Sequence, residues 1–433
     1  MAMRSHYTKQ VTPEMDGNEV QLAGWVHEIR DLGGLKFILL RDKTGIVQLT
    51  IKKKEADPAL VAVADKFVKE VAILCTGKVK ASKIAPRGFE IMPTKIEVVG
   101  EVHGIVPFEV TGKVPADLDV RLDKRFIDLR RLETTAVFKV RSVAMAAFRQ
   151  KLDELEFSEI TPTCLVGSST EGGTDLFPVV YFDKEAFLAQ SPQLYKQMAV
   201  MGGMDKVYMI TPVFRAEKHN TPFHLNEITQ MDIEMGFATH EDAIDVLEAV
   251  FLNVLKKVSE TCKDELTLLG SAVTVPEKVP RFTYSQIVDK LNAAGHKITW
   301  GEDFSKDQEK EMPALLGSEA FFITEWPTAI RAFYSMPNPD KPEICYAFDL
   351  MYKGVELSSG AQRIHQPDLL IKQLKAKGLR PESFEGYIDA FRYGSIPHAG
   401  WSIGAERLTM KLANRDNIRE CVLFPRDRHR LTP

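Results

Sequence analysis

The chain has 433 residues, a length that suits two or three domains and excludes a small disulfide-stapled scaffold. Its 56 lysines and arginines against 60 aspartates and glutamates give a net charge of −4, which excludes a polycationic protein that binds nucleic acid over its whole surface. Hydrophobic residues make up 44% of the chain and charged residues 27%, so bulk disorder is excluded as well.

Cysteine usage and apolar runs indicate the cellular compartment. The five cysteines are widely spaced and odd in number, which fits neither a disulfide framework nor a zinc knuckle and predicts free thiols. No uncharged apolar run reaches the ~18 residues needed to cross a bilayer, and the start of the chain has no apolar signal core. We therefore expect a cytoplasmic protein that does not associate with a membrane.

Residues 1–104 are predicted to form a small β-barrel. Glycine-containing turns separate five apolar stretches, and a helix-like stretch lies between the third and the fourth. The expected strands are 20–26, 36–40, 46–51, 71–76 and 89–92, and the expected helix is 57–69. This order is typical of an OB-fold, which commonly binds single-stranded nucleic acid. A small barrel without a ligand has the same pattern, and the lysine clusters of this region are equally typical of a solvated surface.

Residues 105–133 are predicted to be an irregular hinge, because prolines and glycines precede a charge-dense stretch at 121–131. Residues 134–433 are expected to form a second domain. Its predicted helices are 136–155 and 241–262, and its strands are 157–162, 207–216, 226–237 and segments near 320, 345 and 355. Strands and helices do not alternate regularly and no Gly-Lys-Ser/Thr loop is present, which excludes a Rossmann or P-loop nucleotide site.

Two polar segments of the second domain could bind phosphate. An apolar strand ends in Arg215 and Glu217, and the guanidinium fork of an arginine there suits an α-phosphate. Arg-x-Glu pairs are also common as surface ion pairs. In residues 400–412, small residues lead into an amphipathic helix whose first turn carries Arg407, and a cation at a helix N-terminus suits an anion.

The segment 348–363 could bind a divalent cation. Asp349 and Glu356 lie seven residues apart, so they share a face of a strand only if a turn at Lys353 and Gly354 changes the phase. With that turn both carboxylates could reach one Mg²⁺, an ion that prefers carboxylate and phosphate oxygens. Two exposed acids at a hairpin remain the alternative.

Together these segments resemble the class II aminoacyl-tRNA synthetases, and within them the archaeal-type aspartyl-tRNA synthetases, over essentially the whole chain. The segment 157–162 resembles class motif 1, 214–227 resembles motif 2, and 404–407 resembles motif 3. The resemblance implies an α+β protein in which an N-terminal OB-fold barrel is joined to a catalytic domain built on an antiparallel sheet flanked by helices. It also implies an anticodon-binding role for the barrel and a homodimer formed through motif 1.

The resemblance implies that L-aspartate is activated with ATP and Mg²⁺ and then transferred to the 3′ end of a tRNA. Arg215 would bind the α-phosphate, and Arg407 would lie toward the γ-phosphate and adenine, with Glu217 as the third catalytic residue. The implied ATP site consists of Arg215, Glu217, Phe223, His224, Leu225, Glu356, Gly404, Ala405, Glu406 and Arg407. The implied metal ligands are Asp349, Glu356 and Ser359.

The choice of amino acid would depend on two cations. Lys196 and Arg363 would pair with the side-chain carboxylate of aspartate, and asparagine would leave both cations unmatched in a closed site. Glu171 and Asp232 would face the α-ammonium group. The implied aspartate site consists of Glu171, Ser191, Gln193, Lys196, Arg215, Asp232, Ser359 and Arg363. As alternatives, Lys196 could be a solvated helix residue and Glu171 a loop cap.

The implied anticodon site consists of His27, Phe37, Gln48, Pro86 and Glu90. Phe37 would stack on the central uracil while Gln48 and Glu90 read its edge. Relatives that are strict for tRNA(Asp) tend to carry Trp at the place of His27 and Lys near that of Pro86. His27 and Pro86 therefore imply an enzyme that charges both tRNA(Asp) and tRNA(Asn), and a separate amidotransferase that converts the mischarged product.

Other readings remain open. A strict aspartyl enzyme would differ only in accepting C, and not U, as the third anticodon base. Both His27 and Pro86 could then be incidental loop residues. A non-catalytic tRNA-binding paralogue would be expected to lose Arg215, Glu356 or Arg407, and an asparagine-forming paralogue would be expected to lack the barrel. The motif 2 loop carries Phe223 where relatives usually have an arginine, which puts one phosphate contact in doubt.

Overall fold

The computed structural model of the protein describes residues 3–167, 176–218 and 220–433. The chain divides into two compact units, the first ending at Thr135 and the second running from Ala136 to Thr432. The boundary falls in helix α4 (Leu132–Glu154). All five cysteines are free thiols, as predicted. None of the described helices is long and apolar enough to cross a membrane.

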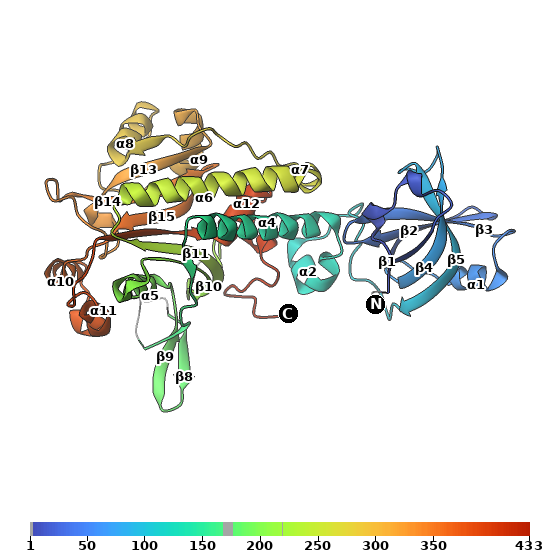
Figure 1. The fold of residues 1–433 in the computed structure, drawn as a ribbon, viewed down its shortest axis with the longest axis horizontal. Helices are drawn as coiled ribbons and strands as arrows, with labels where there is room; N and C mark the ends of the chain where they lie inside the picture. The colour runs from blue at the N-terminus through green and yellow to red at the C-terminus, as the bar shows by residue number, and fades with distance from the viewer. Residues whose placement is uncertain (1–2, 168–175, 219) are drawn as a thin grey trace. The chain divides into compact units, whose positions relative to one another are not determined.

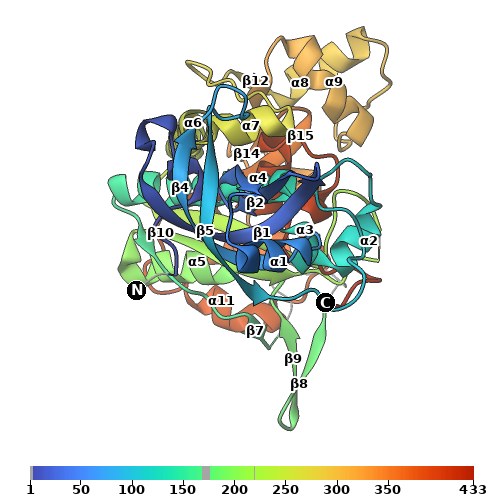
Figure 2. The same ribbon diagram turned by 90° about the vertical axis from the view of Figure 1, so that its right-hand side faces the viewer.

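The first unit contains a closed five-stranded barrel. Its strands are β1 (Glu19–Asp31), β2 (Leu35–Asp42), β3 (Gly45–Lys52), β4 (Ala72–Ala81) and β5 (Phe89–Gly100), in the order β1-β2-β3-β5-β4. Inward apolar side chains of every strand form one buried cluster. The predicted helix is α1 (Pro58–Asp65), which begins where the Asp57 side chain accepts from the amide of Ala59. Figure 2 shows α1 beside the barrel strands. The predicted OB-fold order is confirmed.

The prediction of an irregular hinge was wrong for part of residues 105–133. Two short helices, α2 (Leu118–Asp123) and α3 (Arg125–Asp128), lie within it. The charges that suggested a solvated linker pair with one another instead. The fully buried Asp128 carboxylate accepts hydrogen bonds from Arg121 (Nε–Oδ1 2.7 Å) and Arg125 (Nη1–Oδ2 2.5 Å). The pair between Arg121 and Asp128 joins α2 to α3.

The second unit is built on an eight-stranded sheet in the order β12-β13-β14-β15-β16-β11-β10-β6 (Figure 1). The strands are β6 (Ser158–Glu159), β10 (Lys206–Phe214), β11 (Glu227–Gly236), β12 (Arg281–Thr283), β13 (Ala320–Pro327), β14 (Ile344–Tyr352), β15 (Val355–Gln362) and β16 (His398–Gly404). The six central strands are antiparallel, as predicted. The edge pairs β10 with β6 and β12 with β13 are parallel, so the sheet is mixed rather than wholly antiparallel.

Helices cover one face of this sheet and form the main core. The long helix α6 (His240–Thr261) crosses β14, β15 and β16, and α12 (Ala405–Leu412) follows β16 directly. Figure 1 shows α4 and α6 side by side over the sheet. Trp401 of β16 is fully buried, and its ring meets that of Phe148 of α4 edge to face, with the centroids 6.1 Å apart.

Smaller elements lie around the sheet. The remaining helices are α5 (Gln193–Ala199), α7 (Lys263–Leu269), α8 (Tyr284–Ala293), α9 (Lys306–Leu316), α10 (Pro367–Ala376) and α11 (Glu385–Asp389). A three-stranded sheet joins β7 (Leu165–Val166), β9 (Lys184–Leu188) and β8 (Pro178–Tyr181). The β8–β9 hairpin projects from the rest of the second unit (Figures 1 and 2). The sheet face that α4 and α6 leave uncovered carries the polar residues described next.

Candidate active site

Alternation along the central strands places polar side chains on one face of the sheet. In β11, Met231 and Ile233 belong to the main core, whereas Asp232 and Glu234 point to the opposite face. In β16, Trp401 and Ile403 face the core, and the intervening Ser402 lies opposite Asp232 in the strand pairing. A set of polar and charged groups is therefore held on rigid, neighbouring strands.

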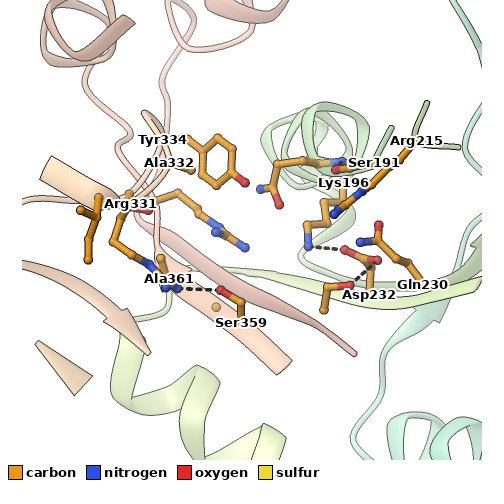
Figure 3. Close-up of a pocket in the computed structure, with 16 residues that line it drawn as sticks. Ser191, Lys196, Arg215, Gln230, Asp232, Arg331, Ala332, Tyr334, Ser359 and Ala361 are labelled. Carbon is orange, nitrogen blue, oxygen red and sulfur yellow. Dashed lines mark hydrogen bonds and ion pairs between the residues drawn. The ribbon is translucent and has the colours of Figure 1, made fainter. Parts of the chain in front are cut away.

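These groups line a cavity of about 300 Å³. Its lining residues are Ser191, Gln193, Lys196, Arg215, Gln230, Asp232, Ile330, Arg331, Ala332, Tyr334, Ser335, Ser359, Gly360, Ala361, Arg363 and Ser402. Seven of the eight residues implied for aspartate are in this set. The eighth, Glu171, lies outside the described residues. Figure 3 shows Lys196 pointing toward Asp232 on one side of the cavity, while Arg331 meets Ser359 on the other.

Lys196 is a fully buried cation rather than a solvated helix residue. It lies on α5, its side chain is 0% exposed, and its Nζ is 2.6 Å from Asp232 Oδ1 and 3.6 Å from Glu234 Oε2. Ser402 Oγ donates to the other oxygen of Asp232 at 3.0 Å. Two carboxylates therefore lie beside this buried amino group.

Arg363 is the second buried cation of the cavity. Its Nε and Nη2 bind the two oxygens of Glu234 at 2.9 and 3.2 Å. Burial alone would raise the pKa of Glu234, but the charges of Arg363 and Lys196 outweigh it and lower that pKa. Glu234 was not predicted from the sequence. Its signal was present, because Asp232 and Glu234 alternate with the apolar residues Met231, Ile233 and Met235.

A second cavity, of about 160 Å³, adjoins the first. Its lining residues are Arg215, Glu217, Phe223, His224, Leu225, Ile228, Gln230, Glu356, Leu357, Ser359, Ser402, Gly404, Glu406, Arg407 and Ile418. Nine of the ten residues implied for ATP are in this set; the other, Ala405, is buried in the main core. Arg215 lines both cavities, and its Nε is buried without a hydrogen-bond partner among the described residues. A buried, unsatisfied donor of this kind suits an anionic ligand.

Glu406 has an internal partner for each carboxylate oxygen. Arg141 of α4 donates to Oε1 at 2.8 Å, and the amide of Thr229 in β11 donates to Oε2 at 3.0 Å. Glu406 therefore ties the start of α12 to β11 and α4. Its neighbour Arg407 is half-buried, and Nη1 donates to the backbone oxygen of Glu356 at 3.3 Å. Within this pair, Arg407 is the residue placed to meet a ligand.

The hairpin β14–β15 brings the three implied metal ligands to one face. The turn at Lys353 and Gly354 that a shared face requires is present, and it puts Glu356 opposite Met351, on the face of Asp349. A bulge then places Ser359, rather than Ser358, opposite Asp349. Carboxylate and hydroxyl oxygens fit a hard divalent cation.

Arg331 already contacts two of these groups. It donates to both oxygens of Asp349 at 2.9 and 2.7 Å and to Ser359 Oγ at 2.6 Å, and its guanidinium lies 4.8 Å from the ring centroid of Trp326. Burial raises the pKa of Asp349 to about 6 despite the charge of Arg331. Arg331 lies after a short turn that follows β13 and belongs to no sequence motif, so nothing in the sequence predicted its position.

A neutral hydrogen-bond chain extends from Gln193, which lines the first cavity. His398 Nδ1 lies 2.9 Å from the carbonyl of Ile396 and must donate to it, so Nε2 accepts from Gln197 Nε2 at 2.9 Å. Gln197 Oε1 in turn accepts from Gln193 Nε2 and from the Tyr387 hydroxyl, each at 2.9 Å. Burial lowers the pKa of His398 to about 4, so the imidazole is neutral at pH 7.

The residues implied for the anticodon lie on the outer side of the barrel. Phe37 and Gln48 alternate with inward apolar residues, and both are half-buried. Gln48 Nε2 donates to Glu90 Oε2 at 3.2 Å, so these two are in contact. Pro86 is exposed in the loop between β4 and β5. His27 lies on β1, and its surroundings are described below.

Comparison with known proteins identifies the family. The model described as tRNA synthetases class II (D, K and N) matches residues 117–428, and that of the OB-fold nucleic acid binding domain matches 20–99. The chain belongs to the class II tRNA synthetases. This synthetase is 51% identical to the aspartate–tRNA(Asp/Asn) ligase of Methanocaldococcus jannaschii, covering 99% of this chain and 98% of that protein. It is also 51% identical to the ligase of the same name from Archaeoglobus fulgidus, covering 99% of each.

Solved structures similar to this synthetase include enzymes for two amino acids. The asparaginyl-tRNA synthetase of Pyrococcus horikoshii with asparaginyl-adenylate has a TM-score of 0.94 at 34% identity, covering 99% of both chains. The aspartyl tRNA synthetase of Entamoeba histolytica has a TM-score of 0.88 at 33% identity, covering 99% of this chain and 93% of that one. The backbone is thus shared by synthetases for two different amino acids.

Proposed function

We propose that this synthetase is an aspartate–tRNA ligase that charges both tRNA(Asp) and tRNA(Asn). The observation that carries the proposal is the pair of adjoining cavities that share Arg215. One is lined by the buried cations Lys196 and Arg363, which suit the side-chain carboxylate of aspartate. The other is lined by Arg407 and the polar groups that suit ATP.

In the first step, an oxygen of the aspartate α-carboxylate attacks the α-phosphorus of ATP, and the bond from that phosphorus to the pyrophosphate oxygen breaks. Pyrophosphate leaves, and aspartyl-adenylate remains. Arg215 lies at the junction of the cavities, where it can bind the α-phosphate and stabilise the charge that develops on it. Catalysis here is mainly positioning and charge stabilisation rather than attack by a protein nucleophile.

Magnesium would bind at Asp349, Glu356 and Ser359, with phosphate oxygens completing its ligands. It would neutralise charge on the phosphates and hold them in place. No group of three or more His, Cys, Asp or Glu side chains suited to a metal gathers in the described part of the chain. The two carboxylates and the hydroxyl supply oxygen ligands of the kind that Mg²⁺ takes.

In the second step, a hydroxyl of the terminal adenosine of the tRNA attacks the aspartyl carbonyl carbon. The bond from that carbon to the phosphate oxygen breaks, AMP leaves, and the hydroxyl proton passes to solvent or the phosphate. Charging of both tRNAs is supported by His27 and Pro86 and by the similarity to two archaeal aspartate–tRNA(Asp/Asn) ligases. A strict aspartyl enzyme is the alternative.

The remaining partners follow from the same proposal. We infer a homodimer, because a largely apolar groove of about 680 Å³, lined by residues such as Phe138, Met145 and Leu423, runs along α4 beside motif 1. Light scattering should give twice the 48.7 kDa of one chain. We also infer action in the cytoplasm and a downstream amidotransferase that converts aspartyl-tRNA(Asn).

The deciding experiment compares two transcripts that differ only at the third anticodon base, C or U, with purified enzyme, aspartate, ATP and Mg²⁺ at one salt concentration. Comparable charging of both supports the relaxed enzyme. Charging of the C transcript alone would keep the aspartyl ligase and overturn the assignment of His27 and Pro86. Absence of aspartate-dependent pyrophosphate exchange would overturn the ligase itself.

A further inference from the structure

His27 occupies an irregular position in the barrel. The pairing of β1 with β2 joins Val26 to Leu40 and Glu28 to Leu39, so His27 is an extra residue with no partner opposite it. A bulge of this kind turns a side chain away from the direction that regular alternation would give it. Here the imidazole turns toward Arg41, which lies opposite Trp25 on the same two strands.

Arg41 is held from two sides. Its side chain is 2% exposed, Nη1 lies 2.7 Å from His27 Nδ1, and Nη2 binds both oxygens of Glu70 at 3.0 and 2.8 Å. Glu70 also accepts from Arg130 Nη1 at 3.1 Å, and Arg130 stacks over Trp25 with 4.9 Å to the ring centroid. The guanidinium of Arg41 therefore has no freedom to turn away from the histidine.

The backbone around Glu70 also holds this side chain in place. Glu70 adopts a φ of +70°, a conformation that is uncommon for any residue except glycine. Its amide donates to the carbonyl of Val26, the residue before His27, at 2.7 Å. The loop that supplies the carboxylate is thus fastened to the bulged strand itself.

The contact with Arg41 determines which nitrogen of His27 carries the proton. A guanidinium has only N–H donors and stays protonated, so His27 Nδ1 must accept. The ring is therefore neutral with its proton on Nε2. Burial lowers the pKa of His27, and the charge of Arg41 lowers it further, which favours this neutral form. No described residue forms a hydrogen bond with Nε2, so one N–H donor remains for a ligand.

We propose that Arg41 is a positioning residue that holds His27 with Nε2–H directed to O2 of the third anticodon base. The inference rests on the proposed function, in which the barrel binds the anticodon. It adds which atom of the third base accepts a hydrogen bond from His27. On its pairing edge cytosine offers O2 and N3 as acceptors and N4 as a donor, whereas uracil offers O2 and O4 as acceptors and N3 as a donor. O2 is the only group at the same position with the same polarity in both. A single fixed donor to O2 therefore accepts C and U alike.

Atomic substitutions in the RNA test this without altering the protein. Six transcripts would carry cytosine, uracil, pyrimidin-2-one, 2-thiouracil, 2-thiocytosine or 4-thiouracil as the third anticodon base. Pyrimidin-2-one lacks any group at C4 but keeps O2, so its charging should stay within about threefold of that of cytosine. Sulfur at C2 is a poorer acceptor and should lower kcat/KM about threefold to tenfold, the range of one hydrogen bond. The 4-thiouracil transcript is the matched control with the same atom at the unread position.

Two results would overturn the inference. One is a loss of tenfold or more with pyrimidin-2-one, and the other is a larger penalty for 4-thiouracil than for 2-thiouracil, since each would mean that the C4 group is read. If the C transcript alone is charged, the relaxed function fails instead. If both natural transcripts are charged and the C4 group is read, the function stands and the inference fails.

Variants of Arg41 test its positioning role. Arg41→Met should remove the difference between uracil and 2-thiouracil, because Nε2–H is no longer fixed, while Arg41→Lys retains a donor to Nδ1 and should keep part of it. Aspartate-dependent pyrophosphate exchange in both variants reports whether the catalytic unit is intact. A full sulfur penalty in Arg41→Met would contradict the role. If that variant does not fold, His27→Leu gives the same readout, and a full sulfur penalty there would also overturn the inference.

Discussion

The catalytic cavities and the outer face of the barrel both present polar side chains from neighbouring strands, but they differ in access to water. In the cavity, the side chains of Lys196 and Glu234 are 0% exposed and that of Arg363 is 4% exposed. On the barrel, Phe37, Gln48 and His27 are half-buried. When a buried charge loses its partner, water cannot reach it to take the partner's place. When a half-exposed group loses its partner, water can. We therefore expect loss of a sealed charge in the cavity to abolish amino-acid activation, and changes on the barrel to weaken tRNA charging while activation continues.

The largest effect is expected from Arg363→Ala. This change leaves the carboxylate of Glu234 without its bidentate partner and facing the carboxylate of aspartate. Losing one member of a buried pair costs about 4 kcal/mol, so aspartate-dependent pyrophosphate exchange should fall roughly 10³-fold.

Arg281→Ala is the matched control, because Arg281 also pairs with carboxylates, but its side chain is 28% exposed and those of its partners Glu241 and Asp245 are 57% and 73% exposed. Its exchange rate and melting temperature should stay close to those of the unaltered enzyme. If aspartate-dependent pyrophosphate exchange is unchanged in Arg363→Ala, a buried charge is no more important to the reaction than a half-exposed one, and the comparison fails.

The next effect concerns the buried imidazole of His398. Its pKa of about 4 in the folded state lies below the ~6.5 of the unfolded chain, so protons bind preferentially to the unfolded state as the pH falls. This contribution to stability is complete above about pH 6.5 and is lost toward pH 4, by about 3 kcal/mol.

The measurement is the free energy of unfolding as a function of pH for the unaltered enzyme and for His398→Asn. Their difference isolates the imidazole from Asp349, whose pKa of about 6 titrates over the same range with the opposite sign. A difference that does not change between pH 6.5 and 4 would mean that His398 is not buried in its neutral form.

The barrel and the core helices were predictable because each has a clear period. Inward apolar residues alternate in the barrel strands, and α6 repeats them at helical spacing. Strand β16 was not predicted, because its small residues were interpreted only as the lead into the helix that follows. The structure explains one of these small residues: a Cβ at Gly400 would collide with the carboxylate of Glu234. Glycine at position 400 therefore makes room for the carboxylate of the buried ion pair.

The site divides in the same way. Residues carried by motifs, such as Arg215 and Arg407, line the cavities that the resemblance implied. Arg331 and Gln197 could not be predicted, because one follows a short turn and the other is one of several polar residues on a helix. Only the packing of distant segments brings Arg331 to Asp349 and Gln197 to His398. Contacts between segments far apart in sequence leave no local pattern.

On the barrel, Phe37→Ala should lower tRNA charging without affecting amino-acid activation. Loss of one stacked base costs about 2 kcal/mol, so charging of both tRNAs should fall roughly 30-fold in kcat/KM. Aspartate-dependent pyrophosphate exchange should not change, because no tRNA is involved in that step. Phe237→Ala, at an exposed phenylalanine outside the barrel, should leave both reactions unchanged. A parallel fall in exchange after Phe37→Ala would mean that Phe37 supports the fold rather than the anticodon.

The smallest effect is expected at Arg331. Its side chain is 15% exposed, which is more than the sealed charges of the first cavity, whereas that of its partner Asp349 is 1% exposed. The guanidinium contacts both carboxylate oxygens that a divalent cation would use, so the two cations compete for Asp349. Arg331→Gln should therefore tighten the binding of Mn²⁺, used as a probe for Mg²⁺ in the absence of ATP, by roughly tenfold, or about 1.4 kcal/mol. Electron paramagnetic resonance of free Mn²⁺ measures this affinity directly. Arg331→Lys keeps a positive charge and should bind Mn²⁺ as weakly as the unaltered enzyme, whereas equal affinities in all three proteins would mean that Asp349 serves to orient Arg331 and that the metal rests on Glu356 and the phosphates.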